Sequence, residues 1–100
     1  MNKQILTIEE IIRIVKPLAE KYHISAVYIF GSYARGEADG ESDVDILVNG
    51  GTDFNKKQIF SFGSELSAAF GKPVDAYEIC EIKAESKLYQ SIMKDRVKVA

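Results

Sequence analysis

Two aspartates at alternate positions, Asp43 and Asp45, stand at the start of a short apolar run and are well placed to do chemistry. Because side chains alternate between the two faces of a strand, both carboxylates should project from one face. Neighbouring carboxylates repel each other, so the pair must be solvated, protonated or bridged by a cation. Carboxylate oxygens are hard ligands, which favours Mg²⁺ together with a phosphate group as the occupant.

A glycine-serine turn, Gly31-Ser32, precedes the acidic pair and follows the apolar run 26–30. We expect Ser32 to cap a short helix over residues 33–35 that Gly36 closes. Free backbone N–H groups at such a turn can bind phosphate oxygens, and a glycine lets the ligand approach the backbone closely. The turn and the acidic pair together predict a site for a phosphorylated ligand.

A third carboxylate, Asp75, lies in the segment 74–79, whose composition predicts another strand. Asp75 and Tyr77 should share one face of that strand. We interpret the ring of Tyr77, like those of Tyr28 and Tyr33, mainly as a packing group.

The remaining pattern indicates helices that alternate with short strands. Thr7 and Glu10 form a predicted capping box that begins the first helix, which should end near Tyr22. The other predicted elements are a helix over 54–70 capped by Thr52 or Asp53, a helix over 83–93, and strands over 26–30, 43–49, 74–79 and 97–99. This is one α/β domain over residues 1–100, in which the sequence leaves the strand directions open.

Composition excludes several functional classes. The 100 residues carry a formal charge of −2 without a basic stripe, so direct nucleic-acid binding is not expected. No apolar run reaches the length of a membrane span and the N-terminus does not resemble a signal peptide, so we expect a soluble, cytoplasmic protein. The lone Cys80 offers neither a disulfide nor a zinc site, and we expect it to be buried.

Two other phosphate or metal motifs do not fit. Gly31 and Gly36 have the spacing of a Walker A loop, but Glu37 and Ala38 stand where lysine and serine or threonine are required. The segment from Asp39 to Asp45 lacks the alternating ligands, central glycine and final glutamate of an EF-hand calcium loop.

The pattern Gly31-Ser32-x3-Gly36-x6-Asp43-x-Asp45, with Asp75 downstream, resembles the signature of the DNA polymerase β-like nucleotidyltransferase superfamily. Within it, the stretches 30–36 and 42–48 are similar to those of the prokaryotic minimal nucleotidyltransferases. The resemblance extends from the first helix to Val97. It implies a polymerase β-like nucleotidyltransferase fold, with a small mixed sheet flanked by helices.

The resemblance also implies roles for individual residues. Asp43, Asp45 and Asp75 would be the catalytic and metal-binding carboxylates, together holding two Mg²⁺ ions. Asp75 could also accept the proton of the attacking hydroxyl. Gly31 and Ser32 would bind the β- and γ-phosphates of ATP. Arg35 would either bind a phosphate or be an ion-paired surface residue.

The function implied by the resemblance is that of an Mg²⁺-dependent protein adenylyltransferase. Such proteins act as antitoxins of HEPN-domain ribonuclease toxins, with which they would form a hetero-oligomer, and some transfer AMP from ATP to a tyrosine of the toxin. Two alternatives stay open. The chain could neutralise a toxin by contact alone, or it could modify a small molecule as aminoglycoside nucleotidyltransferases do, although its length disfavours the latter.

Overall fold

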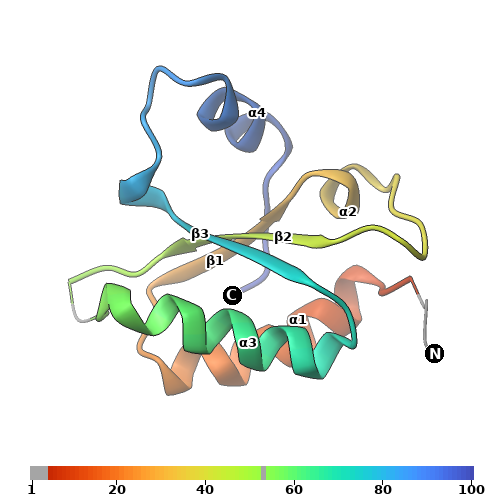
Figure 1. Cartoon of the computed structure of the whole chain (residues 1–100), viewed down its shortest axis with the longest axis horizontal. Helices are drawn as coiled ribbons and strands as arrows, with labels where there is room; N and C mark the ends of the chain where they lie inside the picture. The colour runs from red at the N-terminus through yellow and green to blue at the C-terminus, as the bar shows by residue number, and fades with distance from the viewer. Residues whose placement is uncertain (1–4, 53) are drawn as a thin grey trace.

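A mixed β-sheet with helices on both faces is the framework of the computed structural model, which describes residues 5–52 and 54–100. Within these ranges the strands are β1 (Ala26–Phe30), β2 (Val44–Asn49), β3 (Val74–Glu78) and β4 (Val97–Lys98). The helices are α1 (Ile8–Lys21), α2 (Ser32–Arg35), α3 (Ile59–Phe70) and α4 (Lys87–Asp95), with 3₁₀ turns η1 (Lys56–Gln58) and η2 (Ile79–Glu81). Helices α1 and α3 cover one face of the sheet, and α4 lies on the other (Figure 1).

The strand order is β3-β2-β1-β4. Strand β1 runs antiparallel to both β2 and β4, whereas β2 and β3 are parallel and are joined through α3. A parallel connection needs such a crossover, because a tight turn can join only antiparallel strands. The predicted α/β fold with a small mixed sheet is therefore confirmed.

The first helix begins where its capping residues predict. The Thr7 hydroxyl accepts a hydrogen bond from the Glu10 N–H, and the Glu10 carboxylate accepts one from the Thr7 N–H, both at 3.0 Å. The helix continues through Pro17 and ends at Lys21, with Tyr22 as its C-cap residue. His23 follows in a left-handed conformation, exposed and outside any element, as expected of a residue just past a helix end.

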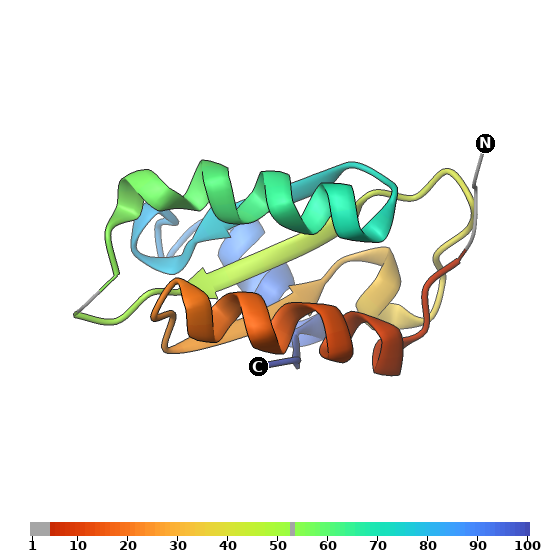
Figure 2. The same cartoon turned by 90° about the horizontal axis from the view of Figure 1, so that it is seen from below.

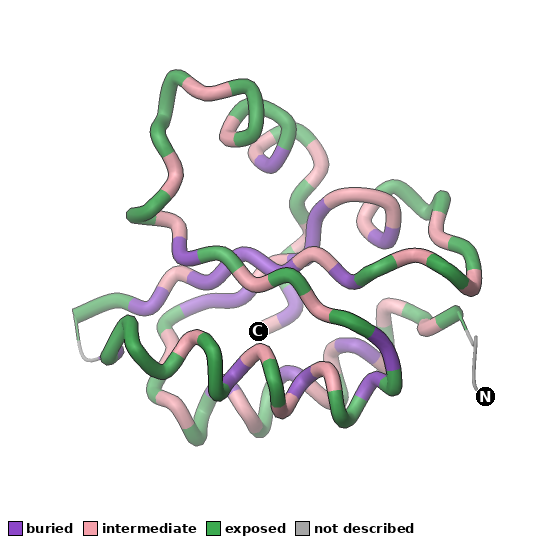
Figure 3. Tube along the Cα trace, viewed as in Figure 1, coloured by how far each residue is buried: buried purple, intermediate pink, exposed green. Residues whose placement is uncertain are grey.

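The main hydrophobic core lies between the sheet and the pair α1 and α3. Figure 2 shows these helices side by side and running in opposite directions, and Figure 3 shows that buried residues concentrate in the sheet and on inward turns of the helices. Alternation along β2 sends Val44, Ile46 and Val48 into this core. Asp45 and Leu47 therefore project from the opposite face, where Leu47 packs with Phe30 and Ile92 in a smaller apolar cluster.

Two predicted helices begin later in the chain than expected. The side chain of Asn55 accepts a hydrogen bond from the Lys57 N–H at 3.0 Å and starts η1, so that α3 begins only at Ile59. Thr52 is therefore not its cap, and Asp53 lies outside the described residues. The last helix begins at Lys87, because the Ser86 hydroxyl accepts a hydrogen bond from the Tyr89 N–H at 3.1 Å.

Two further expectations concern the surface. Cys80 is exposed in η2 rather than buried, because the 3₁₀ turn after β3 lies outside the packed layers. None of the helices in the described part of the chain is both long enough and apolar enough to cross a bilayer.

Candidate active site

The turn after β1 has a backbone conformation that only glycine adopts readily. Gly31 has φ of +74° and ψ of −150°, and it is the N-cap residue of α2. Ser32 is the first helical residue, so the predicted capping role of its side chain is wrong: the helix makes no side-chain cap hydrogen bond. The chain reverses again at Gly36, which is left-handed and donates its N–H to the Ser32 and Tyr33 carbonyls.

The backbone of Gly31 lies directly against the carboxylate of Asp45. A Cβ atom added at Gly31 would overlap Asp45 Oδ2, at a separation that real Cβ contacts do not show. By contrast, a Cβ atom at Gly36 would meet nothing within 4 Å. Gly31 is therefore required both by its backbone conformation and by the close approach of the turn to the carboxylate.

Strand register brings two of the three predicted carboxylates together. Asp45 pairs with Phe30 of β1 on one side and with Asp75 of β3 on the other. Paired residues in neighbouring strands project from the same face, so the Asp45 and Asp75 side chains are neighbours. Asp43 immediately precedes β2 and is exposed, as is Asp75, whereas Asp45 is half-buried.

The electrostatic environment of Asp45 reflects this crowding. Partial burial raises the pKa of its carboxyl group, and the negative charges of Asp75 and Asp43 raise it further. The positive charge of Arg35 has a smaller, opposing effect. Among the described residues, the Asp45 side chain makes no hydrogen bond or ion pair. A carboxylate held without a counterion beside two others is the arrangement found at functional sites.

The donor set suits a hard divalent cation. Carboxylate oxygens are the ligands that Mg²⁺ prefers, and a cation would relieve the repulsion that raises the pKa of Asp45. The three side chains are not gathered into a finished cage. Within residues 5–52 and 54–100, no group of three or more histidine, cysteine, aspartate or glutamate side chains is placed to hold a metal ion. Ligand oxygens, such as those of a nucleotide, would have to complete the coordination.

Arg35 adopts the ion-paired alternative of its two predicted roles. Its Nε lies 2.8 Å from Glu37 Oε1, and its NH1 lies 3.0 Å from Asp95 Oδ2 at the end of α4. The guanidinium thus links α2 to α4. Bidentate phosphate binding by Arg35 would therefore compete with these two carboxylates for the N–H donors of the guanidinium.

A buried lysine that the sequence pattern did not reveal links two of the segments that form the site. Lys72 is only 8% exposed, and its Nζ donates to the Tyr33 hydroxyl at 2.6 Å. Tyr33 belongs to α2, while Lys72 lies three residues before Asp75 on the approach to β3. The hydrogen bond therefore ties the turn that carries Ser32 to the strand that carries Asp75. No local motif marks a lysine of this kind, because its partner is 39 residues away.

Tyr77 packs as expected and also lies near the carboxylates. It pairs with Leu47 two residues along from the Asp45–Asp75 pair, its ring packs against Phe30 at 5.7 Å between centroids, and it is 37% exposed. Burial raises the pKa of Tyr77, and the charges of Asp75 and Asp45 contribute to the increase.

Comparison with protein families is decisive for the chain as a whole. The model of the family described as polymerase beta, nucleotidyltransferase, matches residues 9–100. The chain belongs to this nucleotidyltransferase family. The match contains the Gly31 turn and all three carboxylates, and it confirms the resemblance that the sequence pattern indicated.

Individual relatives agree with the family assignment. A protein of Methanocaldococcus jannaschii, provisionally named as a protein adenylyltransferase, is 34% identical over 92 residues, which are 92% of this chain and 91% of the relative. Two solved structures share the fold. One is a toxin-antitoxin with AMP-PNP, with TM-score 0.74, 22% identity, and coverage of 95% of this chain and 73% of the other. The second contains the tri-AMPylated Shewanella oneidensis HEPN toxin in complex with an MNT antitoxin, with TM-score 0.71, 17% identity, and coverage of 94% and 72%.

Replacing Asp45 with asparagine should stabilise this nucleotidyltransferase at neutral pH. Because the folded state raises the pKa of Asp45, the ionised carboxylate destabilises the fold above that pKa, and stability is regained as the pH falls through it. Asp45→Asn should therefore have a higher Tm than the wild type at pH 7, and the difference should shrink towards pH 4. Thermal unfolding across this pH range measures the effect. Glu85→Gln, at an exposed loop position, should show no such trend, and an Asp45→Asn Tm at or below wild type at pH 7 would contradict the analysis.

Alanine substitutions at Gly31 and Gly36 distinguish two costs, the strain of a positive φ and the steric collision of a new Cβ atom with the Asp45 carboxylate. Both glycines have positive φ, so both variants should lose about 1 kcal/mol or more of unfolding free energy, with the larger intrinsic cost at Gly31. Only Gly31→Ala also collides with the Asp45 carboxylate. Urea unfolding should show the greater loss for Gly31→Ala, and adding Asp45→Gly should recover part of it. If Gly31→Ala costs the same unfolding free energy in the wild-type and Asp45→Gly backgrounds, the contact between residue 31 and Asp45 is refuted.

Proposed function

We propose that this chain transfers AMP from ATP to a hydroxyl group of a HEPN-domain toxin and so acts as its antitoxin. The observation that carries the proposal is the pairing of Asp45 with Asp75 against the Gly31 turn. This arrangement places carboxylates, which suit metal-bound phosphates, beside a backbone turn that suits phosphate oxygens. The provisional name of the M. jannaschii relative supports protein adenylylation, and the AMP-PNP and HEPN complexes support the nucleotide and the partner.

The proposed roles divide between donor and acceptor. Asp43, Asp45 and Asp75 would hold two Mg²⁺ ions, whose charge would offset that of the triphosphate and of the leaving pyrophosphate. Backbone N–H groups at Gly31 and Ser32 would bind the β- and γ-phosphates. The acceptor oxygen would form a bond to the α-phosphorus while the bond to pyrophosphate breaks, and Asp75 would take the hydroxyl proton.

Label transfer tests the proposed reaction directly. ATP labelled at the α-phosphate is incubated with Mg²⁺, the chain and the HEPN-domain toxin proposed as its partner. The wild type should label the partner, and Asp43→Asn or Asp45→Asn should lower the rate by at least about 100-fold because each removes a charge that binds the metal. Glu85→Gln, in an exposed loop, serves as the matched control and should label at the wild-type rate.

The same assay separates transfer from neutralisation by contact. If wild type and Asp45→Asn protect cells equally from the toxin and neither labels it, the chain acts by contact and the proposed reaction is wrong. If protection and labelling are lost together in Asp45→Asn while the two proteins still associate, transfer is the mechanism.

Metal-dependent nucleotide binding should be visible as thermal stabilisation. A ligand at about 100 times its Kd stabilises the native state by about 2.7 kcal/mol, a Tm increase on the order of 10 °C for a domain of this size. ATP with Mg²⁺ should produce such an increase in the wild type, and ATP with EDTA should produce much less. Asp45→Asn should respond weakly in both conditions. Equal increases for the two proteins with Mg²⁺ would remove Asp45 from the nucleotide site.

A further inference from the structure

Strand β3 is an edge of the sheet, and its outer side is open. In the described part of the chain it pairs with β2 alone. The Pro73 carbonyl accepts a hydrogen bond from the Val44 N–H of β2 at 3.1 Å. Because backbone groups alternate sides along a strand, those of Val74 and Ala76 point away from β2. These two residues offer N–H and C=O groups to a further strand.

A groove runs along this open edge, formed by two adjoining hollows of about 580 and 430 Å³. We call it the β3 groove. Both hollows are lined by Ile59, Phe60 and Ala76, and together they extend from Pro73 to Glu78, the whole length of the strand. The small residues Gly63, Ser64 and Ser67 of α3 border the smaller hollow, so this helix leaves the edge accessible.

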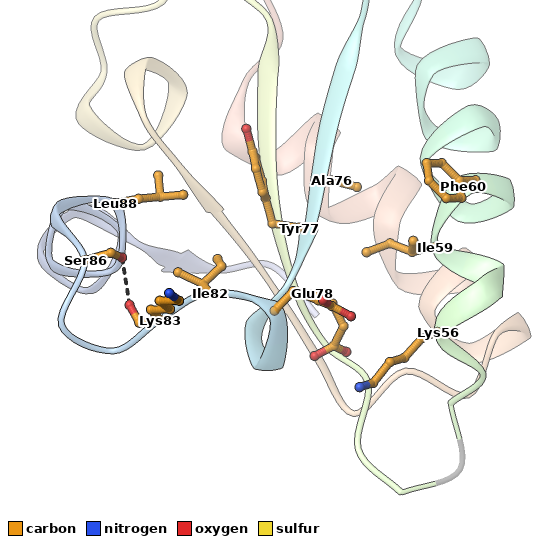
Figure 4. Close-up of a pocket in the computed structure, with 11 residues that line it drawn as sticks. Lys56, Ile59, Phe60, Ala76, Tyr77, Glu78, Ile82, Lys83, Ser86 and Leu88 are labelled. Atoms are coloured by element: carbon orange, nitrogen blue, oxygen red, sulfur yellow. Dashed lines mark hydrogen bonds between the residues drawn. The ribbon is translucent and has the colours of Figure 1, made fainter.

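The larger hollow of the groove is mainly apolar, although it lies at the surface. Phe60 is 82% exposed, Leu88 42% and Tyr77 37%, and all three line the larger hollow. Only one other large hydrophobic residue of the described chain, Ile5, is similarly exposed. In Figure 4 Ile59 and Phe60 lie on one side of β3, and Leu88 and Ile82 lie on the other. Exposed apolar side chains gathered along an unpaired strand indicate a binding surface.

Hydrogen bonds fix the far end of the groove in place. The buried Glu78 accepts from the Gly50 N–H through Oε2 and from the Cys80 N–H through Oε1, both at 3.0 Å. These bonds join the end of β3 to the loop after β2 and to η2. The strand edge is therefore already positioned, so that a partner does not have to order it on binding.

We propose that the acceptor polypeptide binds as an extended strand along the free edge of β3, with its hydroxyl side chain opposite Asp75. The inference rests on the proposed transfer to a protein hydroxyl. Side chains of paired residues lie on one face about 5 Å apart at their Cβ atoms, so the hydroxyl would lie next to the Asp75 carboxylate. Strand addition of this kind uses backbone bonds for affinity and pockets for specificity.

The same register predicts what flanks the hydroxyl residue. A residue next to it would lie opposite Ala76 and turn to the α3 side, onto Ile59 and Phe60. The residue beyond would lie opposite Tyr77, between that ring and Leu88. The acceptor segment should therefore carry apolar side chains at the first and second positions from its hydroxyl. The larger hollow is lined by two lysines, Lys56 and Lys83, and two glutamates, Glu78 and Glu81, so apolar contacts rather than charge should select the segment.

Substitutions along the groove test this docking mode with the HEPN-domain toxin proposed as the acceptor. Phe60→Ala and Leu88→Ala should each raise the KM for this protein about tenfold, because each removes an apolar contact that the acceptor buries. Ile5→Ala removes an apolar group outside the groove whose exposure, 52%, lies between those of Phe60 and Leu88, and it should leave the KM unchanged. Nucleotide-induced changes in Tm should be the same for all three variants and the wild type.

A proline substitution and amide hydrogen exchange test the proposed backbone hydrogen bonds between β3 and the acceptor strand. Proline is tolerated in an edge strand where the missing N–H faces outwards, so Ala76→Pro should leave the β2 pairing intact while it blocks strand addition. Amide hydrogen exchange avoids reliance on this variant, which could unfold. Binding of the HEPN-domain protein should slow exchange at Ala76, the free-edge N–H, more than at Asp75, which faces β2.

The outcomes distinguish the docking mode from the reaction. One outcome overturns the docking proposal and leaves the transfer intact. In it, Phe60→Ala, Leu88→Ala and Ile5→Ala all label the partner as the wild type does, and exchange at Ala76 is not slowed. Slowed exchange at Ala76 without any label refutes the transfer but supports the groove as the binding edge. If the free chain is a dimer in solution and Ala76→Pro or Phe60→Glu makes it a monomer, a second copy occupies the edge and the proposal is wrong.

Discussion

Three negative charges are held close together at one end of the sheet, and the free energy that keeps them there comes from the rest of the domain. Asp45 has the least favourable position, since it is half-buried, faces Asp75 and Asp43, and touches the backbone of Gly31. Its partial burial and the charges of the two neighbouring carboxylates disfavour its ionised form. The core must offset this cost, as is usual where a site is organised for chemistry rather than for stability.

The offset comes from alternate residues of the same strand. Val44, Ile46 and Val48 are fully buried against α1 and α3, so β2 cannot slide by one residue without exposing them. The register that buries these side chains is the register that sets Asp45 beside Asp75 and Phe30. Burial of the apolar face of β2 and the crowding of carboxylates on its other face are thus consequences of one packing arrangement.

Local sequence patterns were sufficient for the elements that carry this arrangement. Alternation predicted β2 from Val44 onwards, although Asp43 lies just before the strand, and the capping box predicted where α1 begins. Local sequence patterns did not predict the residue that caps the turn before α3 or the contacts between residues far apart in the chain. Asn55 rather than Thr52 caps the turn before α3, and both residue types are common helix caps. The Lys72–Tyr33 hydrogen bond and the Arg35–Asp95 ion pair join residues 39 and 60 positions apart, which periodicity cannot reveal.

The small size of the domain is consistent with the open edge of β3. A chain of 100 residues can bury one core, and here that core lies between the sheet and α1 with α3. Within the described residues, Asp75 lies on the edge strand β3, which pairs only with β2, and α4 lies on the sheet face opposite α1 and α3 (Figure 1). The exposure that leaves Asp75 weakly covered also makes it accessible to a second polypeptide. A donor site on one side of this strand and an apolar groove along its free edge are therefore compatible within one small sheet, and the strand itself sets the distance between them.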